Sequence, residues 1–178
     1  LTVTFYANCS GATGSQFQYT QAALGTDWTH VAGACDISVP DCIIYVDGSA
    51  VTTDTTLSNA TSISNCTSNF TVGSVEGGSF WDGHLDEIRV WDDLRTATEI
   101  SDNYQLEIDG DGGNNLVSVW HVNNDLLDGN NTNNNDLTDN NTVGYSTDIP
   151  FGGATPNFIS SVIMTYMDRV DPVEIVNV

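Results

Sequence analysis

Two adjacent carboxylates, Asp86 and Glu87, are the first side chains in this sequence that could do chemistry. They stand in the middle of SFWDGHLDEIRVWDDLRTATEI, residues Ser79–Ile100, where apolar and polar side chains alternate. Successive side chains of an extended segment point to opposite faces. We therefore do not expect Asp86 and Glu87 to work together as a general acid and base.

Other catalytic candidates form no recognisable constellation. The segment LEIDGD, residues Leu106–Asp111, has acids at alternate positions, but its glycine indicates a turn, and the paired carboxylates of glycoside hydrolysis are not evident. The motifs GxSxG and HExxH are absent, and the histidines His30, His84 and His121 are scattered along the chain. The sequence therefore predicts a protein that is not an enzyme.

The loop DGNNTNNNDLTDNNT, residues Asp128–Thr142, is dense in the oxygen ligands that calcium prefers. Asp128, Asn131, Asn133 and Asp136 offer carboxylate and amide oxygens. The loop is not an EF-hand, because it lacks the bidentate glutamate of that motif. We predict a structural calcium site here, with a solvated loop that holds no ion as the alternative.

Tryptophan side chains could stack on sugar rings. Trp28, Trp91 and Trp120 lie in apolar strand patterns, which predict a place in the core. Trp81 precedes a glycine turn and is the candidate for binding a ligand at a rim.

Extended segments must position these side chains, because the sequence alternates with period two over much of its length. Asp47-Gly48 lies between two extended runs and predicts a tight hairpin, since both central positions need positive φ. Thr96 and Glu99 have the spacing of a capping box and predict a short helix that ends near Tyr104. The predicted strands cover residues 1–7, 28–34, 42–51, 69–74, 116–122 and 155–167.

Charge restricts the partners of the chain. Its 178 residues include 24 Asp and Glu, three Arg and no Lys, for a formal net charge of −21. Such a charge repels nucleic acid and anionic membrane, so neither is an expected partner. The most apolar stretch near residues 158–164 is too short to span a membrane. The composition favours a secreted or salt-adapted surface.

Four cysteines lie in the first 66 residues without a CxxC pair, which favours two disulfides over a zinc or redox site. Cys35 and Cys42 bracket a six-residue connection between extended segments, so a bridge across a hairpin mouth is plausible. Cys9 then pairs with Cys66, although the other two connectivities stay open. Free cysteines in a reducing compartment are the alternative.

Six N-x-Ser/Thr sequons agree with the cysteines and favour an extracellular protein. The acceptor residues are Asn8, Asn59, Asn65, Asn69, Asn130 and Asn140.

Five segments, in this order, resemble the laminin-G-like, concanavalin A-like jelly rolls of extracellular proteins. They are Trp28–Asp36, Ile44–Val51, Phe70–Ser74, Trp81–Ile100 and Leu116–Leu137. The resemblance implies an all-β fold, a two-sheet antiparallel jelly-roll sandwich with one short helix. It also implies that Asp86 can lie near the Asp-rich loop and join its calcium ligands.

The family usually has several strands before the segment that matches the start of this chain. A sandwich without them would have unpaired edges. We therefore expect a β-sandwich over residues 1–150 and a C-terminal segment, residues 151–178, that completes a sheet or contacts a neighbouring subunit. The missing strands could also come from residues before Leu1, or from a neighbouring subunit by strand addition.

These observations predict an extracellular structural or adhesion module, a subunit or surface domain of a larger assembly or filament at a cell or virion surface. Its partners would be other protein subunits, with self-assembly expected. The alternative is a calcium-dependent, lectin-like module that binds glycans.

Overall fold

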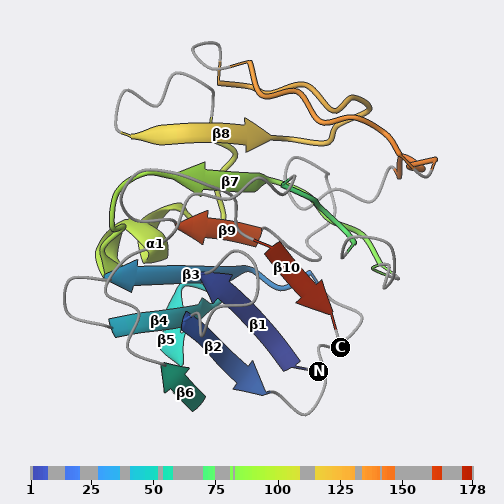
Figure 1. The fold of residues 1–178 in the computed structure, drawn as a ribbon. Coiled ribbons are helices and arrows are strands. Elements are labelled where there is room, and N and C mark those ends of the chain that lie inside the picture. Colours follow the sequence, from blue (N-terminus) through green and yellow to red (C-terminus); the bar gives the residue numbers. More distant parts are fainter. Residues whose placement is uncertain are drawn as a thin grey trace.

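The computed structural model describes residues 2–7, 15–20, 28–36, 41–51, 54–57, 70–74, 81, 83–108, 115–130, 134–140, 142–146, 162–165 and 174–177. These residues form two β-sheets that lie against each other, and a single helix within the described ranges (Figure 1). The all-β, two-sheet sandwich with one short helix is confirmed.

The smaller sheet has four strands in the order β10-β1-β2-β6, and each pairing in it is antiparallel. Its strands are β10 (Glu174–Asn177), β1 (Thr2–Ala7), β2 (Ser15–Thr20) and β6 (Asp54–Leu57). The sheet packs on the larger one through β2, which contacts β4.

The larger sheet has six strands in the order β5-β4-β3-β9-β7-β8. They are β5 (Ser49–Val51), β4 (Asp41–Val46), β3 (Val31–Asp36), β9 (Val162–Thr165), β7 (Ile88–Trp91) and β8 (Leu116–Trp120). The pairings are antiparallel except those of β9, which runs parallel to both β3 and β7. The C-terminal segment thus contributes one strand to each sheet, as Figure 1 shows in red. The division of the chain at residue 150 stays a prediction.

The predicted Asp-Gly hairpin joins β4 to β5. Asp47 and Gly48 both have positive φ, 47° and 74°, which is the geometry that a two-residue turn requires. A Cβ atom on Gly48 would also lie 2.7 Å from Cδ1 of Tyr104. Glycine is therefore needed here both for the turn and for its packing against the end of the helix.

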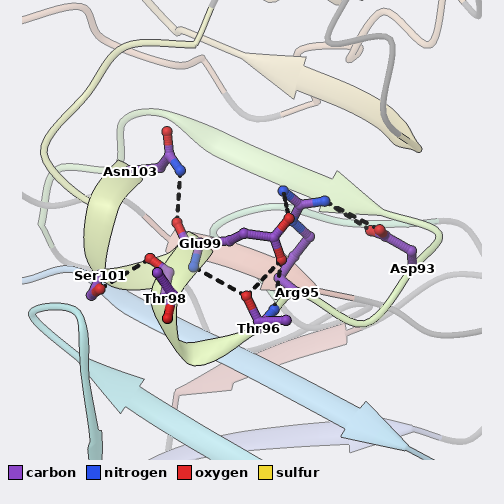
Figure 2. A network of polar contacts seen from close by, with 7 residues as sticks. All are labelled: Asp93, Arg95, Thr96, Thr98, Glu99, Ser101 and Asn103. Atoms are coloured by element: carbon purple, nitrogen blue, oxygen red, sulfur yellow. Dashed lines mark hydrogen bonds and ion pairs between the residues drawn. The ribbon is translucent and has the colours of Figure 1, made fainter.

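The helix α1 (Ala97–Asn103) begins with the predicted capping box (Figure 2). The Thr96 hydroxyl accepts a hydrogen bond from the Glu99 amide at 3.2 Å, and Glu99 Oε2 accepts one from the Thr96 amide at 2.9 Å. Hydrogen bonds from the Thr96 amide and the Thr96 hydroxyl to the Glu99 carboxylate lower the pKa of Glu99. Arg95 adds an ion pair to Glu99 at 2.8 Å. Tyr104 caps the other end, so the predicted bounds are confirmed.

The core lies where α1 covers the larger sheet. Ile100 of α1 packs into a buried cluster contributed by β3, β4, β7 and β8. Its other members are Ala32, Ala34, Tyr45, Trp91, Leu116 and Val119. Trp91 and Trp120 are buried, as the strand patterns predict, whereas Trp28 is only half-buried, so its predicted place in the core is wrong.

The predicted strand at residues 69–74 is wrong for most of its described length. Residues 70–73 are irregular, and only Ser74 forms an isolated bridge. The Thr71 hydroxyl donates to the Ser74 carbonyl at 2.8 Å, and the Trp81 amide donates to the Gly73 carbonyl at 2.8 Å. These contacts bend the segment into a turn, where Gly73 has a φ of 72°.

Candidate functional site

A cavity of about 1040 Å³ opens where loops meet beside the start of β7 and the end of β8. We call it the β7 cavity. Residues 70–74, Trp81, residues 83–86 and Ile88 line one part of its wall, and residues between 122 and 146 line another. Its aromatic side chains are Trp28, Phe70, Trp81 and Tyr145, and its carboxylates are Asp86 and Asp136. The β7 cavity therefore combines ring surfaces with hydrogen-bonding groups.

Trp81 is held on the cavity wall by local contacts. Its Nε1 donates to the His84 carbonyl at 3.3 Å, and a Cβ atom on Gly83 would lie 2.7 Å from that nitrogen. Glycine at position 83 is thus what lets the indole lie close to the backbone. Trp81 is partly exposed, which agrees with the predicted rim position.

The loop that follows β8 is organised by the buried carboxylate of Asp128. Its Oδ1 accepts hydrogen bonds from the amides of Val119 at 3.1 Å and Asn130 at 2.9 Å, and its Oδ2 accepts one from the Asn135 amide at 3.0 Å. The Asp128 amide donates to Oδ1 of Asp136 at 2.9 Å. Protein donors thus engage both oxygens of Asp128.

The Asp128 carboxylate closes the loop through backbone amides, and its predicted role as a calcium ligand stays a prediction. Asp86 and Asp136 do line the same β7 cavity. Asn131 and Asn133 lie outside the described residues. A calcium ion held through Asp86 and Asp136 stays a prediction.

Asp86 is buried at the cavity wall, with 6% of its surface exposed. Its Oδ1 accepts a hydrogen bond from the Glu87 amide at 2.9 Å. Burial raises the pKa of Asp86 to about 7, against the effect of that hydrogen bond, and the nearby charges of Glu87 and Glu107 add to the rise. A carboxyl group that titrates near neutrality therefore faces the cavity.

Glu87 points away from the cavity into a buried polar network. Its Oε2 forms an ion pair with Nη2 of Arg89 at 2.9 Å, and its Oε1 lies 2.5 Å from Nδ1 of His121. Arg89 also donates to the carbonyls of Asn103 and Leu106. The hydrogen bond to Glu87 raises the pKa of His121, while burial lowers the pKa of Arg89.

Asp86 and Glu87 thus point into different surroundings, as the sequence predicts. The reason differs from the predicted one. Glu87 has a φ of 52°, which is left-handed backbone and not strand. This turn, rather than strand alternation, separates the side chain of Glu87 from that of Asp86. Non-glycine residues with such φ values are strained and cluster at functional sites. Val122 and Thr142, at 54° and 65°, are two further examples, and both line the β7 cavity.

Glu87, Glu107 and His121 form a cluster whose ligand atoms lie within 4.8 Å of one another. Oε1 of Glu107 is 3.7 Å from Nδ1 of His121. The separation of 2.5 Å between Glu87 and His121 is that of a hydrogen bond, too short for two ligands around a zinc ion with bonds of about 2 Å. Arg89 already neutralises Glu87. The cluster is therefore a hydrogen-bonded network as it stands.

Sequence reasoning missed this convergence, although strand pairing contains a signal for it. Ile88 pairs with Trp120 in the antiparallel β7–β8 register. The next residues outward along the two strands are Glu87 and His121, which brings their side chains together.

His30 is completely buried against the ring of Tyr104, with centroids 5.6 Å apart. Neither ring nitrogen has a hydrogen-bond partner among the described residues. Burial, with a smaller contribution from Arg89, lowers the pKa of His30 to about 3. His30 is therefore a neutral core residue at physiological pH.

The predicted sequons differ in accessibility. Asn130 is buried, and its Nδ2 donates to the carbonyls of Leu116 and Val117 at 2.5 and 3.0 Å. A glycan on Asn130 does not fit this geometry, because the acceptor nitrogen is enclosed. Asn140 is exposed at the cavity rim. The acceptors Asn8, Asn59, Asn65 and Asn69 lie outside the described residues.

Cys35 is disulfide-bonded, and the strand register places Cys42 directly opposite it. This register agrees with the preferred Cys35–Cys42 bridge, which stays a prediction together with the Cys9–Cys66 bridge. Cys9 and Cys66 lie outside the described residues.

The two stacked sheets define a β-sandwich domain with a loop-lined cavity. A family model described as the Concanavalin A-like lectin/glucanases superfamily matches residues 2–101, more than half of the chain. The chain therefore belongs to this superfamily, which confirms the resemblance seen in the sequence. No curated protein and no solved structure matches the chain in these comparisons. Within the described residues, no helix is long and apolar enough to cross a membrane.

Proposed function

We propose that the domain is a non-catalytic recognition module that binds carbohydrate in the β7 cavity. The observation that carries the proposal is the composition of the cavity lining, where the rings of Trp81 and Tyr145 share a cavity with Asp86, Asp136 and Asn140. Sugars present apolar C–H faces and polar O–H edges. Aromatic rings match the first, and carboxylate and amide groups match the second.

The size of the cavity supports an oligosaccharide ligand. Sites of roughly 300–1,000 Å³ enclose most of a drug-sized molecule, and the β7 cavity holds about 1040 Å³. The left-handed backbone at Val122 and Thr142 supports a functional role for this wall, since strained residues gather at ligand sites.

The acidic groups favour binding over hydrolysis. A glycosidase needs two carboxyl groups that flank the scissile bond. Glu87 and Glu107 converge on His121, but Glu87 is 1% exposed and both its oxygens are engaged. A carboxylate in that position cannot reach a substrate, so Glu87 and Glu107 are not such a pair. Of the two carboxylates that line the cavity, Asp136 accepts a hydrogen bond from the Asp128 amide within its own loop. We propose that the domain is not an enzyme.

A role as a structural or adhesion subunit is our second candidate function, after carbohydrate binding. It depended on strands missing from the sandwich, and β9 and β10 of the same chain occupy places in both sheets. An extracellular location remains part of the proposal. The disulfide at Cys35 and the exposed sequon at Asn140 support it.

A glycan array with the full chain, at pH 8, tests the proposal. We expect reproducible binding of a defined set of oligosaccharides, weakened at least tenfold by Tyr145→Ala, because Tyr145 is 45% exposed and lines the cavity. Leu94→Ala is the matched control, since Leu94 is 41% exposed and does not line the cavity. Repeating the array in EDTA tests the calcium dependence. Absence of binding to any glycan, or equal loss in both variants, would contradict carbohydrate recognition in the β7 cavity.

A further inference from the structure

One N-x-Ser/Thr sequon lies at the rim of the β7 cavity. Asn140 and Thr142, its first and third residues, both line the cavity and are both exposed. These are the two residues that the attachment of an N-linked glycan requires. Asn130, in contrast, is buried with its Nδ2 enclosed. Of the two acceptors that the structure describes, Asn140 is therefore the one on which a glycan fits the fold.

Local hydrogen bonds hold the Asn140 side chain against the cavity lining. The Asp139 carboxylate accepts a hydrogen bond from the Val143 amide at 3.2 Å, so the backbone turns back within the sequon. The Asn140 Nδ2 donates to the Thr138 carbonyl at 3.3 Å, and Thr138 also lines the cavity. An asparagine Nδ2 has two protons. A glycan replaces one of them, and the other can keep the hydrogen bond to Thr138.

Open space and an aromatic ring follow the sequon along the chain. A Cβ atom on Gly144 would meet no atom within 4 Å. The side chain of Tyr145 is 45% exposed and lines the cavity. Sugars attached to Asn140 therefore find room on this stretch and a ring on which their apolar faces can stack. The cavity volume of about 1040 Å³ is sufficient for several sugar residues.

We infer that a glycan attached to Asn140 occupies the β7 cavity and competes there with free oligosaccharide, so that glycosylation regulates binding. The inference rests on the proposed carbohydrate function and on the proposed extracellular location. In the attachment step, Asn140 Nδ2 forms a bond to C1 of an oligosaccharide carried on a lipid pyrophosphate. The bond between C1 and the pyrophosphate oxygen breaks, Nδ2 loses one proton, and the lipid pyrophosphate leaves.

A tethered competitor acts at a high local concentration. A short flexible linkage gives an effective concentration on the order of 1 mM. If the attached sugars bind the cavity with a Kd of about 0.1 mM, this concentration weakens the binding of free ligand about tenfold by mass action.

The test compares four samples of the full chain. Wild type and Thr142→Ala are each secreted from eukaryotic cells and each made in a bacterial periplasm without N-glycosylation. Thr142→Ala destroys the sequon and keeps Asn140, and it should fold because Thr142 is exposed. Mass spectrometry of the Asn140 peptide shows which samples carry a glycan. Calorimetry with an oligosaccharide that binds on the array gives four Kd values, with calcium present throughout so that any ion site is equally filled.

The two periplasmic samples give the effect of the substitution alone, because neither carries a glycan. The glycans on other sequons are common to the two secreted samples, so their effect cancels in the cycle. After correction for the substitution, secreted Thr142→Ala should bind about tenfold more tightly than secreted wild type.

The outcomes separate the inference from the proposed function. The same effect of Thr142→Ala in both hosts would overturn the inference and leave carbohydrate binding intact. A secreted wild type without a glycan on Asn140 would overturn it as well. Failure of the periplasmic wild type to bind any oligosaccharide would overturn the proposed function itself, and the regulation with it.

Discussion

Glu87 and Arg89 form a buried ion pair that stabilises the domain as long as both partners are present. The side chain of Glu87 and that of Arg89 are 1% and 0% exposed and form an ion pair at 2.9 Å. Glu87→Ala would leave the Arg89 guanidinium buried without its counter-charge. Removing one partner of a buried pair destabilises a protein by about 3–5 kcal/mol, and we expect a loss of that size here.

The left-handed backbone of Glu87 provides a matched comparison. A φ of 52° strains any residue with a Cβ atom by roughly 1–2 kcal/mol. Glycine avoids this strain but raises the entropy of the unfolded chain, at roughly 0.5–1 kcal/mol. Glu87→Gly should therefore be more stable than Glu87→Ala by about 0.5–1 kcal/mol, although it removes more of the side chain.

Urea unfolding at pH 8 and 25 °C, followed by the fluorescence of the buried tryptophans, measures these differences. The double variant Glu87→Leu with Arg89→Met replaces both charges by apolar groups and should recover most of the loss. A loss below about 1 kcal/mol for Glu87→Ala, far under the range for a broken buried pair, would refute the reasoning. So would a double variant less stable than Glu87→Ala.

His121 gives a second readout of the same network. The hydrogen bond to Glu87 raises its pKa in the folded state. The stabilisation from protonated His121 is fully present below its ordinary pKa of about 6.5 and is lost as the pH rises through the folded value. In Glu87→Ala the His121 pKa, measured by NMR titration, should fall toward the ordinary value. An unchanged His121 pKa would show that the hydrogen bond is not formed.

Three further changes follow from single contacts. Asp128→Ala should destabilise the domain by about 4–5 kcal/mol in urea unfolding. Hydrogen bonds to a charged group contribute roughly 1.5–3 kcal/mol each, three backbone amides lose their acceptor, and the lower end of that range applies. Full recovery on adding calcium would contradict this. His30→Phe should raise the Tm at pH 5. The folded pKa of about 3 means that only the unfolded chain protonates His30 between pH 6.5 and 3, so this residue destabilises the fold as the pH falls. A stability that falls more steeply with decreasing pH in the variant than in the wild type would contradict this. Thr96→Ala should lower the stability by about 1 kcal/mol through loss of the N-cap, measured against Thr98→Ala, and equal losses would argue against the capping box.

Local features of this fold are readable from the sequence because few residues decide them. Thr96 and Glu99 close the start of α1 with hydrogen bonds to each other, and no distant residue is required. Asp47-Gly48 likewise specifies a turn through its own φ values. The segment at residues 70–74 fails as a strand because a local hydrogen bond from Thr71 to Ser74 bends it, together with a contact from Trp81. Its local pattern carries no trace of that contact.

The residues of the candidate site could be predicted from the sequence only in part, because distant contacts decide the roles of the others. Trp81, Asp86 and Asp136 are identifiable as chemically promising residues, and the structure places them on one cavity. Asp128 lies in a loop whose composition suits calcium, and its carboxylate accepts hydrogen bonds from backbone amides that hold the loop together. The pairing of Glu87 with His121 spans 34 positions and depends on the β7–β8 register. Composition cannot tell a ligand-binding carboxylate from a structural one, because the hydrogen-bond donors around each carboxylate are set by the fold.

Glu87, whose backbone is left-handed, connects Asp86 at the cavity wall to the buried network of Arg89 and His121. Arg89 and His121 hold the Glu87 side chain, and the Glu87 amide in turn holds Oδ1 of Asp86. A buried carboxyl whose pKa is raised to about 7 withdraws stability from the folded state as the pH rises from about 4 to 7. We therefore regard the network behind the cavity as the support that allows Asp86 to face a ligand, so that weakening Glu87 should disturb the orientation of Asp86 as well as the stability of the domain.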